Sequence, residues 1–504
     1  MNSDFVPPTT AAQPRIIPRS DHPISRRGIS PNALRVLYRL KEGGFEGYLV
    51  GGCVRDLILG REPKDFDVAT NALPEEVKRL FRNCRLVGRR FRLAHVFFGR
   101  EIIEVATFRA SNAPPPGEEP ISELMTDDEA AENEDLVDGL DDSGPPLDEN
   151  GDINGNIDFD VPAPVDEHGN PARVLDSSGR ILRDNNYGSI EDDVWRRDFT
   201  ANSLYYNVND FSIWDYCGGT DDIAARRLKL IGDPETRYRE DPVRMLRAAR
   251  FEAKLGFTLD PATEAPIESL RELLGRVPAA RLFDESLKLF LTGHGAQSFE
   301  VLRRRRLLEV LYPTVGEYFE KHPGSLVEQL LVQGLRNTDE RVLGNRAVTP
   351  TFLFALLLYG PIAAQIEATP PEHWHEAATI LTACDAALRE AQDRISIPRR
   401  FSLGVREMFA LQPRLEHPRG RRALRTLEHP RFRAAYDLLL LRAKLGMASP
   451  DTAQWWTRVQ EVSGDERERM VGALDQSHPN EPRSPSGTGP RRRRRGGRRR
   501  SGAT

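Results

Sequence analysis

Two carboxylates lie one residue apart in the stretch PKDFDVATNA, which spans residues 63–72. If this stretch is a β-strand, Asp65 and Asp67 point to the same face, because side chains two residues apart in a strand share a face. Two neighbouring negative charges repel each other unless a cation lies between them. An isolated Asp-x-Asp pattern is commonly a solvated edge or turn, but carboxylates are also the ligands of Mg²⁺, which leaves other positions to water and phosphate.

A candidate phosphate-binding turn precedes this stretch in YLVGGCVRDLILG (48–60). The pattern predicts a strand, a turn at Gly51 and Gly52, and a helix. Glycines at such a turn let the backbone approach a phosphate, and the first N–H groups of the helix carry positive partial charge. Arg55 in the first helical turn could hold phosphate oxygens with its guanidinium group. A Gly-Gly pair alone is a weak signal, but a strand carrying Asp-x-Asp directly after it favours a nucleotide site.

Two downstream segments add charged residues to predicted elements. EIIEVATFR (101–109) predicts a strand with Glu104 on its polar face, either as a third carboxylate beside the cations or as an edge residue. RRDFTANSLYYN (196–207) places Arg197 and Asp198 against an apolar and aromatic segment. Neither segment assigns a chemistry by itself.

REDPVRMLRAARFEAKLGF (239–257) predicts a helix with Asp241 as its N-cap and Pro242 in its first turn. The helix has an apolar stripe and a parallel basic stripe, and a cap with a solvated basic face would explain it taken alone. The basic stripe consists of Arg244, Arg247, Arg250 and Lys254.

The net charge of −5 hides two opposite blocks. Residues 113–170 contain 19 Asp or Glu and no Lys or Arg, and the rest of the chain then carries 71 basic against 57 acidic residues, a balance of +14. A basic remainder is typical of nucleic-acid binders. Within the acidic block, NGDINGNI (150–157) begins like a calcium loop, but Val161 stands where the bidentate Glu belongs, so we favour a disordered acidic linker.

The end of the chain carries eight arginines within residues 491–500. A block with no apolar partner cannot pack, so we expect a disordered arm, and we interpret it as RNA-binding rather than as a solubility tail. Its arginines are Arg491, Arg492, Arg493, Arg494, Arg495, Arg498, Arg499 and Arg500.

Other features of the composition narrow the class of protein. No apolar run of about 18 residues predicts a membrane span, and the N-terminus lacks the apolar region of a signal peptide. Cys53, Cys84, Cys217 and Cys384 are widely spaced, which argues against a disulfide framework and a zinc site. We therefore expect a cytoplasmic protein with no membrane insertion.

Taken in chain order, the motifs GGCVRDLILG, KDFDVATNA, EVATFR, RRDFTANSLYYN and REDPVRMLRAARF resemble those of the class II polymerase-β-like nucleotidyltransferases. That branch includes bacterial poly(A) polymerases and CCA-adding tRNA nucleotidyltransferases. The resemblance covers residues 30 to 260 approximately and implies an α+β fold: a head with a small mixed sheet and helices, followed by all-α neck, body and tail domains.

The expected domain bounds combine this resemblance with the composition. They are a flexible N-terminal segment (1–30), a nucleotidyltransferase head (31–205) with a disordered acidic insert (113–175), a helical neck with a base-binding motif (206–275), an RNA-binding helical body and tail (276–475), and a disordered Arg-rich tail (476–504).

The resemblance also implies roles for individual residues. Asp65 and Asp67 would hold two Mg²⁺ ions, with Glu104 as a further catalytic carboxylate, and ATP would be the substrate. Asp198 would contact the ribose hydroxyl, and Asp241 with Arg244 would meet the base edge in place of a template. The implied nucleotide-binding set is Gly51, Gly52, Arg55, Arg197, Asp198, Asp241, Arg244 and Arg247.

Three stretches favour the poly(A) polymerase branch: LVGRRFRLAHV (86–96), IPRRFSLGVREMFALQPRL (397–415) and RTLEHPRFRAAYDLLLLRA (425–443). A sequence-blind basic arm also suits an enzyme that accepts many RNA 3′ ends. We expect a monomer that binds ATP and single-stranded 3′ ends of mRNA and other transcripts, with RNA-decay proteins as further partners. The alternatives are a CCA-adding enzyme and, in another class, a non-catalytic RNA-binding protein on the same scaffold.

Overall fold

The computed structural model describes residues 13–88, 92–109, 174–175, 181–183 and 187–477. The chain divides into two compact units, Met1–Arg406 and Glu407–Thr504. The strands are β1 (Arg15–Ile17), β2 (Gly47–Val50), β3 (Asp67–Thr70), β4 (Cys84–Val87), β5 (Leu93–Phe98), β6 (Glu101–Thr107), β7 (Val174–Leu175), β8 (Ile181–Arg183), β9 (Leu204–Asn207), β10 (Ile213–Asp215), β11 (Arg227–Leu228) and β12 (Thr258–Leu259).

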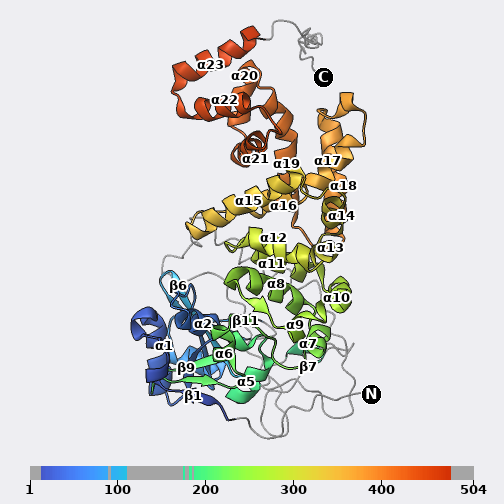
Figure 1. The fold of residues 1–504 in the computed structure, drawn as a ribbon. Helices are drawn as coiled ribbons and strands as arrows, with labels where there is room; N and C mark the ends of the chain where they lie inside the picture. The colour runs from blue at the N-terminus through green and yellow to red at the C-terminus, as the bar shows by residue number, and fades with distance from the viewer. Residues whose placement is uncertain (1–12, 89–91, 110–173, 176–180, 184–186, 478–504) are drawn as a thin grey trace, which may run out of the picture. The chain divides into compact units, whose positions relative to one another are not determined.

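Helices dominate the chain after the sheet (Figure 1). The α-helices are α1 (Pro31–Glu42), α2 (Gly52–Ile58), α3 (Pro74–Leu80), α5 (Ile190–Arg196), α6 (Gly219–Ala224), α7 (Pro234–Glu240), α8 (Val243–Leu255), α9 (Pro261–Glu264), α10 (Ile267–Leu270), α11 (Ala279–Phe290), α12 (Gly295–Arg304), α13 (Leu308–Leu311), α14 (Pro313–Lys321), α15 (Leu326–Leu343), α16 (Pro350–Leu357), α17 (Tyr359–Glu367), α18 (Ala377–Gln392), α19 (Arg399–Glu416), α20 (Gly420–Leu427), α21 (Phe432–Lys444), α22 (Pro450–Glu461) and α23 (Gly464–Ser477). Short 3₁₀ helices are η1 (Arg19–Asp21), η2 (Arg26–Gly28), η5 (Thr200–Asn202), η6 (Arg271–Arg276) and η7 (Pro371–His373).

The first unit begins with an eight-stranded mixed sheet in the order β1-β10-β9-β2-β3-β6-β5-β4. In this sheet β3 and β6 run parallel, and every other neighbouring pair is antiparallel. The parallel pair lies near the middle of the sheet, where both strands have hydrogen-bonded neighbours on either side. Residues at the start of β3 are therefore held between two strands.

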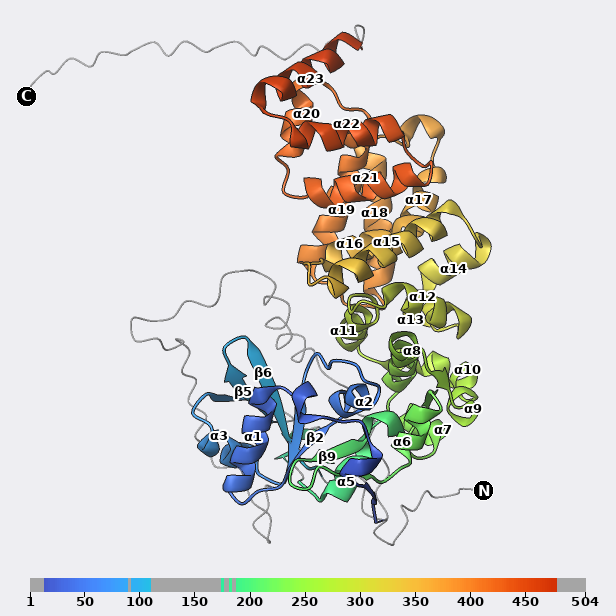
Figure 2. The same ribbon diagram turned by 60° about the vertical axis from the view of Figure 1, so that its left-hand side comes forward.

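Opposite faces of the sheet are covered by different helices. On one face, α1 and α3 pack beside each other (Figure 2). A Cβ at Gly47 of β2 would lie 3.2 Å from Leu37 and 3.3 Å from Leu40 of α1, so the helix approaches the strand closely. Tyr48 and Val50 of β2 point to the other face and pack with α5 in a buried cluster. This second face carries the candidate site.

After the sheet, α8, α11 and α12 pack against one another, as both figures show. Glu252 of α8 bonds two arginines at the end of α12, Arg304 and Arg305. The Glu252 and Arg305 side chains are only 10% and 8% exposed, so this contact joins the two helices away from solvent. The position of α8 is thus fixed from the side of the helical body.

The second unit has its own core. Trp456 of α22 is fully buried and donates its ring N–H to the Leu415 carbonyl oxygen of α19 at 2.7 Å. Phe432 and Tyr436 of α21 pack in the same cluster, with Phe432 at 5.4 Å from Trp456 between ring centroids. A buried indole needs such an acceptor for its N–H group.

The predicted fold class is confirmed: a mixed sheet with helices is followed by helical domains. The strands predicted before the Gly51 turn and within residues 101–109 are also confirmed, as β2 and β6. Among the described residues after residue 220, the helices are interrupted by the two-residue strands β11 and β12. The domain bounds given above stay a prediction.

Residues 13–30, expected to be loose, instead form β1, η1 and η2, and β1 pairs with β10 along three residues. The partner strand lies almost 200 residues later in the sequence, so local composition does not reveal it. Within the described part of the chain, no helix is by itself long and apolar enough to cross a membrane; α16 and α17 reach those limits only as a pair, across a 47° bend.

Candidate active site

A row of side chains crosses the second face of the sheet at the start of β3. Asp67 is paired with Val50 of β2 and with Glu104 of β6, and Glu104 is paired in turn with His95 of β5. Directly paired residues on neighbouring strands point to the same face. The Nε2 atom of His95 is 3.7 Å from Oε2 of Glu104. The carboxylates of Asp67 and Glu104 are therefore neighbours on adjacent strands.

Asp65 does not belong to the strand, contrary to our expectation. It lies in the bend before β3, which begins at Asp67. The two carboxylates are nevertheless close enough for Asp65 to act on Asp67. Burial raises the pKa of Asp67 to about 6, the charges of Glu104 and Asp65 add to this, and Arg197 opposes it. Ionised Asp67 is costly here without a further cation.

This donor set fits Mg²⁺ bound jointly with a substrate. Among the residues that the structure describes, no three His, Cys, Asp or Glu side chains are grouped closely enough to hold a metal ion. The protein thus offers a pair of carboxylates rather than a closed cage. Mg²⁺ commonly takes one or two carboxylates and leaves its other positions to phosphate and water.

The predicted phosphate turn lies against this pair. Gly51 has φ +79°, a conformation that favours glycine, and a Cβ there would lie 3.8 Å from both Arg197 Nη1 and Asp67 Oδ2. Arg55, expected to face the phosphates, is 1% exposed and ion-paired with Asp56 at 2.7 Å. A Cβ at Gly52 would lie 3.4 Å from the Arg55 guanidinium, which therefore supports the turn from beneath.

Arg197 is the cation that faces the turn. Its Nη2 is 2.9 Å from Asp193 Oδ2, and its Nε donates to the Tyr205 hydroxyl at 2.9 Å. Tyr205 in turn donates to Asp193 at 2.6 Å. Burial alone would lower the pKa of Arg197, but Tyr205 and Asp193 outweigh it and raise the pKa. The guanidinium is thus a fixed positive charge beside Gly51 and Asp67.

Asp198 joins the sheet domain to α8. Its Oδ1 accepts from Arg244 Nε at 3.1 Å, and its Oδ2 accepts from Arg247 Nε. Burial alone would raise the pKa of Asp198, but Arg247 and Arg244 hold it below its ordinary value. The Arg244 and Arg247 side chains are 12% and 31% exposed. The basic stripe of α8 is therefore not a solvated face.

Asp241 directly follows α7 and caps α8 as predicted. The helix α8 starts at Val243, whose N–H donates to Asp241 Oδ1 at 3.2 Å. The other carboxylate oxygen accepts from Arg281 of α11 at 2.7 Å. Pro242 occupies the first helical position, where no N–H is needed, and the Val243 N–H is the donor that an N-cap side chain accepts.

Several supporting residues were missed by the sequence analysis. Arg237 donates to the carbonyl oxygens of Arg196 and Arg197 at 3.1 and 2.8 Å, which fixes the backbone beside the site. The spacing of Asp193 four residues before Arg197 on a helix would have indicated their ion pair. No sequence signal marked Arg237 or Arg281, because their partners are distant in the chain.

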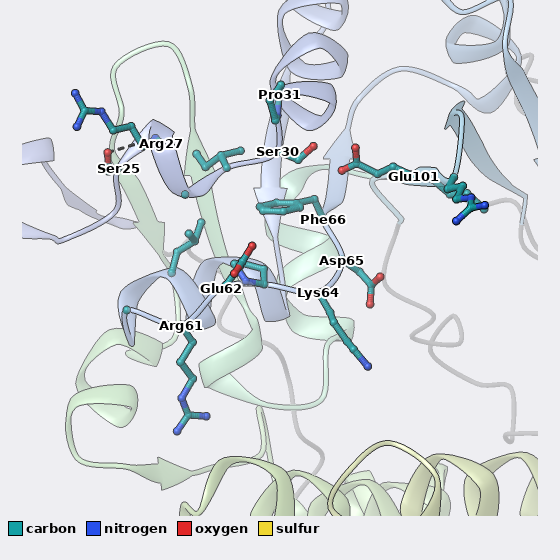
Figure 3. Close-up of a pocket in the computed structure, with 17 residues that line it drawn as sticks. Ser25, Arg27, Ser30, Pro31, Arg61, Glu62, Lys64, Asp65, Phe66 and Glu101 are labelled. Atoms are coloured by element: carbon teal, nitrogen blue, oxygen red, sulfur yellow. Dashed lines mark hydrogen bonds between the residues drawn. The ribbon is translucent and has the colours of Figure 1, made fainter. Parts of the chain in front are cut away.

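A pocket of about 1000 Å³ opens beside Asp65 (Figure 3). Residues 25–31 form one wall and residues 60–66 another, and this pocket was not predicted. Its lining combines apolar, basic and acidic side chains: Leu57, Pro63 and Phe66; Arg27, Arg61, Lys64 and Arg100; and Glu62, Asp65 and Glu101.

Several predicted features lie outside the described residues. These are the acidic insert at 113–170 with its calcium-like stretch, residues 89–91 of LVGRRFRLAHV, and the arginines from Arg491 to Arg500.

The sequence matches three family models in succession. Their descriptions are "Poly A polymerase head domain" (residues 47–229), "Probable RNA and SrmB- binding site of polymerase A" (256–318) and "Polymerase A arginine-rich C-terminus" (372–500). Poly(A) polymerase I of Salmonella typhi is 44% identical over 465 residues, which cover 91% of this chain and 89% of the relative. Poly(A) polymerase I of Haemophilus influenzae is 41% identical over 469 residues, 92% of both chains. The chain belongs to the poly(A) polymerase family.

CCA-adding enzymes are more distant relatives of this poly(A) polymerase family member. The CCA-adding enzyme of Lactobacillus helveticus is 31% identical over 277 residues, 55% of this chain and 54% of the relative. A solved structure described as "Structure of tRNA-processing enzyme with CTP" is 20% identical with a TM-score of 0.51, and covers 88% of this chain and 98% of its own. That likeness shows the fold. The predicted placement in the poly(A) polymerase branch is confirmed, and the chain is a nucleotidyltransferase of this type.

Proposed function

We propose that this chain is a template-independent polynucleotide adenylyltransferase, which adds AMP from ATP to the 3′ ends of RNA. The observation that carries the proposal is the cluster at the start of β3. There Asp67 adjoins Asp65 and Glu104, and the Gly51 turn brings backbone and the Arg197 guanidinium against the same carboxylate. Carboxylates for cations beside a cradle for phosphates are what transfer of a nucleotidyl group requires.

In this proposal Asp65 and Asp67 hold two Mg²⁺ ions. When bound, these ions supply activation of the RNA 3′-hydroxyl and neutralisation of the triphosphate. Glu104 is a neighbour of Asp67 on the adjacent strand. Its negative charge raises the pKa of Asp67, so a bound cation would stabilise the ionised carboxylate. We assign Glu104 a supporting role, with His95 as its partner at 3.7 Å.

The triphosphate of ATP lies along the turn at Gly51 and Gly52. Arg197 reaches this turn with a charge that Asp193 and Tyr205 hold in place, so we assign it the contact with phosphate oxygens. Arg55 is buried beneath the turn and positions it. A preorganised cation costs little reorganisation when charge develops on the phosphates.

The base of the incoming nucleotide is read by the start of α8. Asp198 orients Arg244 and Arg247 through both of its oxygens and lies where the ribose would approach them. Arg244 and Asp241 offer donors and acceptors to a base edge in the manner of a complementary base. One carboxylate oxygen of Asp241 accepts a hydrogen bond from Arg281, so Arg281 positions Asp241 for its contact with the base.

The remaining parts of the proposal concern the cellular setting. The expected RNA substrates are the 3′ ends of mRNA and other transcripts, modified as part of RNA turnover in the cytoplasm. The match of residues 256–318 to the model of an RNA-binding and SrmB-binding site supports contacts with RNA and with a protein partner. RNA-decay proteins are the partners that we expect. We expect the enzyme to act as a monomer.

Replacing Asp65 or Asp67 with Ala tests the catalytic site. Loss of a cation ligand should lower AMP incorporation by at least about a thousandfold. The melting temperature should not fall, because removing one carboxylate relieves repulsion. AMP incorporation into a labelled oligoadenylate with Mg²⁺ measures the first effect. Near-normal turnover of either variant would show that the carboxylates are wrongly assigned.

The choice of substrate is tested by primer extension on an unstructured RNA and on a tRNA that lacks its 3′ end. We expect long adenylate ladders on both RNAs with ATP alone. Addition that stops after three nucleotides and requires CTP would identify CCA synthesis. No extension with any divalent cation would favour a non-catalytic RNA-binding protein.

A further inference from the structure

Arg250 on α8 is a largely buried arginine that the proposed nucleotide site does not use. Its Cζ lies 4.7 Å from the centroid of the Phe251 ring. Its Nε is buried and finds no acceptor, and within the described part of the chain no carboxylate pairs with it. Burial lowers the pKa of Arg250, Glu285 opposes this, and Arg247 adds to it. Glu285 is itself ion-paired with Lys288 at 3.0 Å.

Arg250 belongs to a group of like charges. Arg55 from α2 and Arg247 from α8 also lie over the Phe251 ring, at 5.9 and 5.8 Å from its centroid. Arg55 is paired with Asp56 and Arg247 with Asp198, whereas Arg250 lacks a carboxylate partner among the residues described. An unpaired charge is costly to bury, and neighbouring charges of the same sign increase this cost.

The group continues along α8 to Lys254, one turn after Arg250. Burial lowers the pKa of Lys254; Arg55, Arg250 and Lys64 add to this, and Asp56 opposes it. Lys64 belongs to the loop before β3, so a charge of that loop acts on the end of α8. Lys254 and Lys64 make no ion pair with any residue in the described ranges.

A histidine before α12 is affected by the charges of the same loop and of α8. His294 directly precedes α12, and burial lowers its pKa; Asp339 opposes this, while Lys254, Arg61 and Lys64 add to it. Figure 3 shows Arg61 and Lys64 extending to the same side of their loop. The loop, α8 and the start of α12 therefore carry cationic or titratable groups whose charges act on one another, and the loop groups Arg61 and Lys64 line one pocket with Asp65.

We propose that Arg250, Lys254, Lys64 and Arg61 form a phosphate track that leads the RNA strand to Asp65. The proposal rests on the function proposed above and adds the place where the polymer lies. A polyanion would neutralise cations that have no carboxylate partners among the described residues, and single-stranded RNA supplies one charge per nucleotide.

The geometry favours the RNA strand over the triphosphate as the occupant. The Gly51 turn lies against Asp67, whereas the track reaches the carboxylate pair through Lys64, the neighbour of Asp65 in the chain. From Lys64 the track also continues to the exposed Arg61, which lines the same pocket (Figure 3). An RNA strand extends from the active site to the protein surface, whereas a triphosphate is short and stays within the site.

The first test measures RNA binding without ATP or Mg²⁺, by anisotropy of a short 5′-labelled oligoadenylate. Lys64→Gln and Lys254→Gln should each weaken binding about fivefold and reduce the slope of log K against log salt by about 0.7. Lys41→Gln is the matched control, because Lys41 is an exposed lysine of α1 outside the track. Unchanged RNA affinity in both track variants would overturn the proposal.

Arg250→Met separates a ligand-binding role from a structural one. An unpaired buried charge destabilises the ligand-free protein, so its removal should leave the melting temperature unchanged or raise it, while RNA binding weakens severalfold. A lower melting temperature with unchanged RNA affinity would assign Arg250 to the core and remove it from the track.

Kinetics with ATP distinguish the two sources of phosphate. A raised KM for RNA with an unchanged KM for ATP in Lys254→Gln supports the track. A raised KM for ATP with normal RNA binding assigns these cations to the triphosphate and refutes our proposal. If wild-type protein bound RNA through Lys64 and Lys254 but transferred no AMP, the proposed function would fail and the track would stand.

Discussion

Asp198 uses both carboxylate oxygens to hold Arg244 and Arg247, so it fixes the direction of the proposed base reader before a nucleotide arrives. Arg244 also donates hydrogen bonds to Glu240 and to the Arg237 carbonyl oxygen, both through its Nη1 atom. Its Nη2 makes no hydrogen bond to any residue that the structure describes. This amino group is the one left to meet a base edge.

We therefore expect Arg244→Ala to reduce the preference for ATP over CTP. A lost base-edge contact costs discrimination of roughly 1–3 kcal/mol. Steady-state kcat/KM for each nucleotide measures the effect. Arg239→Ala is a suitable control, because Arg239 of α7 is exposed and pairs only with Glu235 among the described residues. Full ATP selectivity with a loss of RNA affinity would show that Arg244 is an RNA contact instead.

The types and spacing of residues predicted which side chains belong to the candidate site better than they predicted which side chains contact one another. Asp65, Asp67 and the glycine turn were recognised because they lie close together in the sequence, in a turn, a loop and the start of β3. Arg281 could not be predicted, since its partner Asp241 lies 40 residues away and packing of α11 alone brings them within reach. The buried state of Arg55 was unpredictable for the same reason.

At the scale of elements, α8 was predicted as a helix, but its environment was not. Glu252 reads in sequence as an exposed helical residue, yet it is 9% exposed and binds Arg304 and Arg305. The four consecutive arginines from Arg303 onwards suggest a solvated run. In the structure each finds a carboxylate. Those of the first three lie on α15 and α8, beside which α12 ends, and Arg306 pairs with Glu309 of α13.

Glu252→Gln and Glu264→Gln compare two carboxylates on the same arginine. Arg305 binds both, but the Glu252 side chain is 10% exposed and the Glu264 side chain 53%. Loss of the buried partner should lower the free energy of unfolding by about 3 kcal/mol, and loss of the exposed one by less than about 1 kcal/mol. Urea denaturation of both variants measures this. Equal losses would show that α8 and α12 are not joined through Glu252.

At the scale of the whole chain, two charged blocks lie outside the described residues and act by charge. Residues 113–170 carry 19 carboxylates, and residues 491–500 carry eight arginines. We expect these blocks to attract each other at low salt, with the attraction screened within about 8 Å at physiological ionic strength. The insert follows β6, which carries Glu104. RNA and the acidic block would then compete for the same arginines.

Deletion of each block, alone and together, tests this competition. Removing the arm from Arg491 onwards should weaken RNA binding and flatten its salt dependence, because fewer counterions are released from the phosphates. Replacing residues 113–170 by a neutral Gly-Ser segment of the same length should tighten RNA binding, but only in protein that retains the arm. Anisotropy titrations at several salt concentrations measure both effects. Where the replacement tightens binding equally with and without the arm, the insert repels RNA directly and no competition exists.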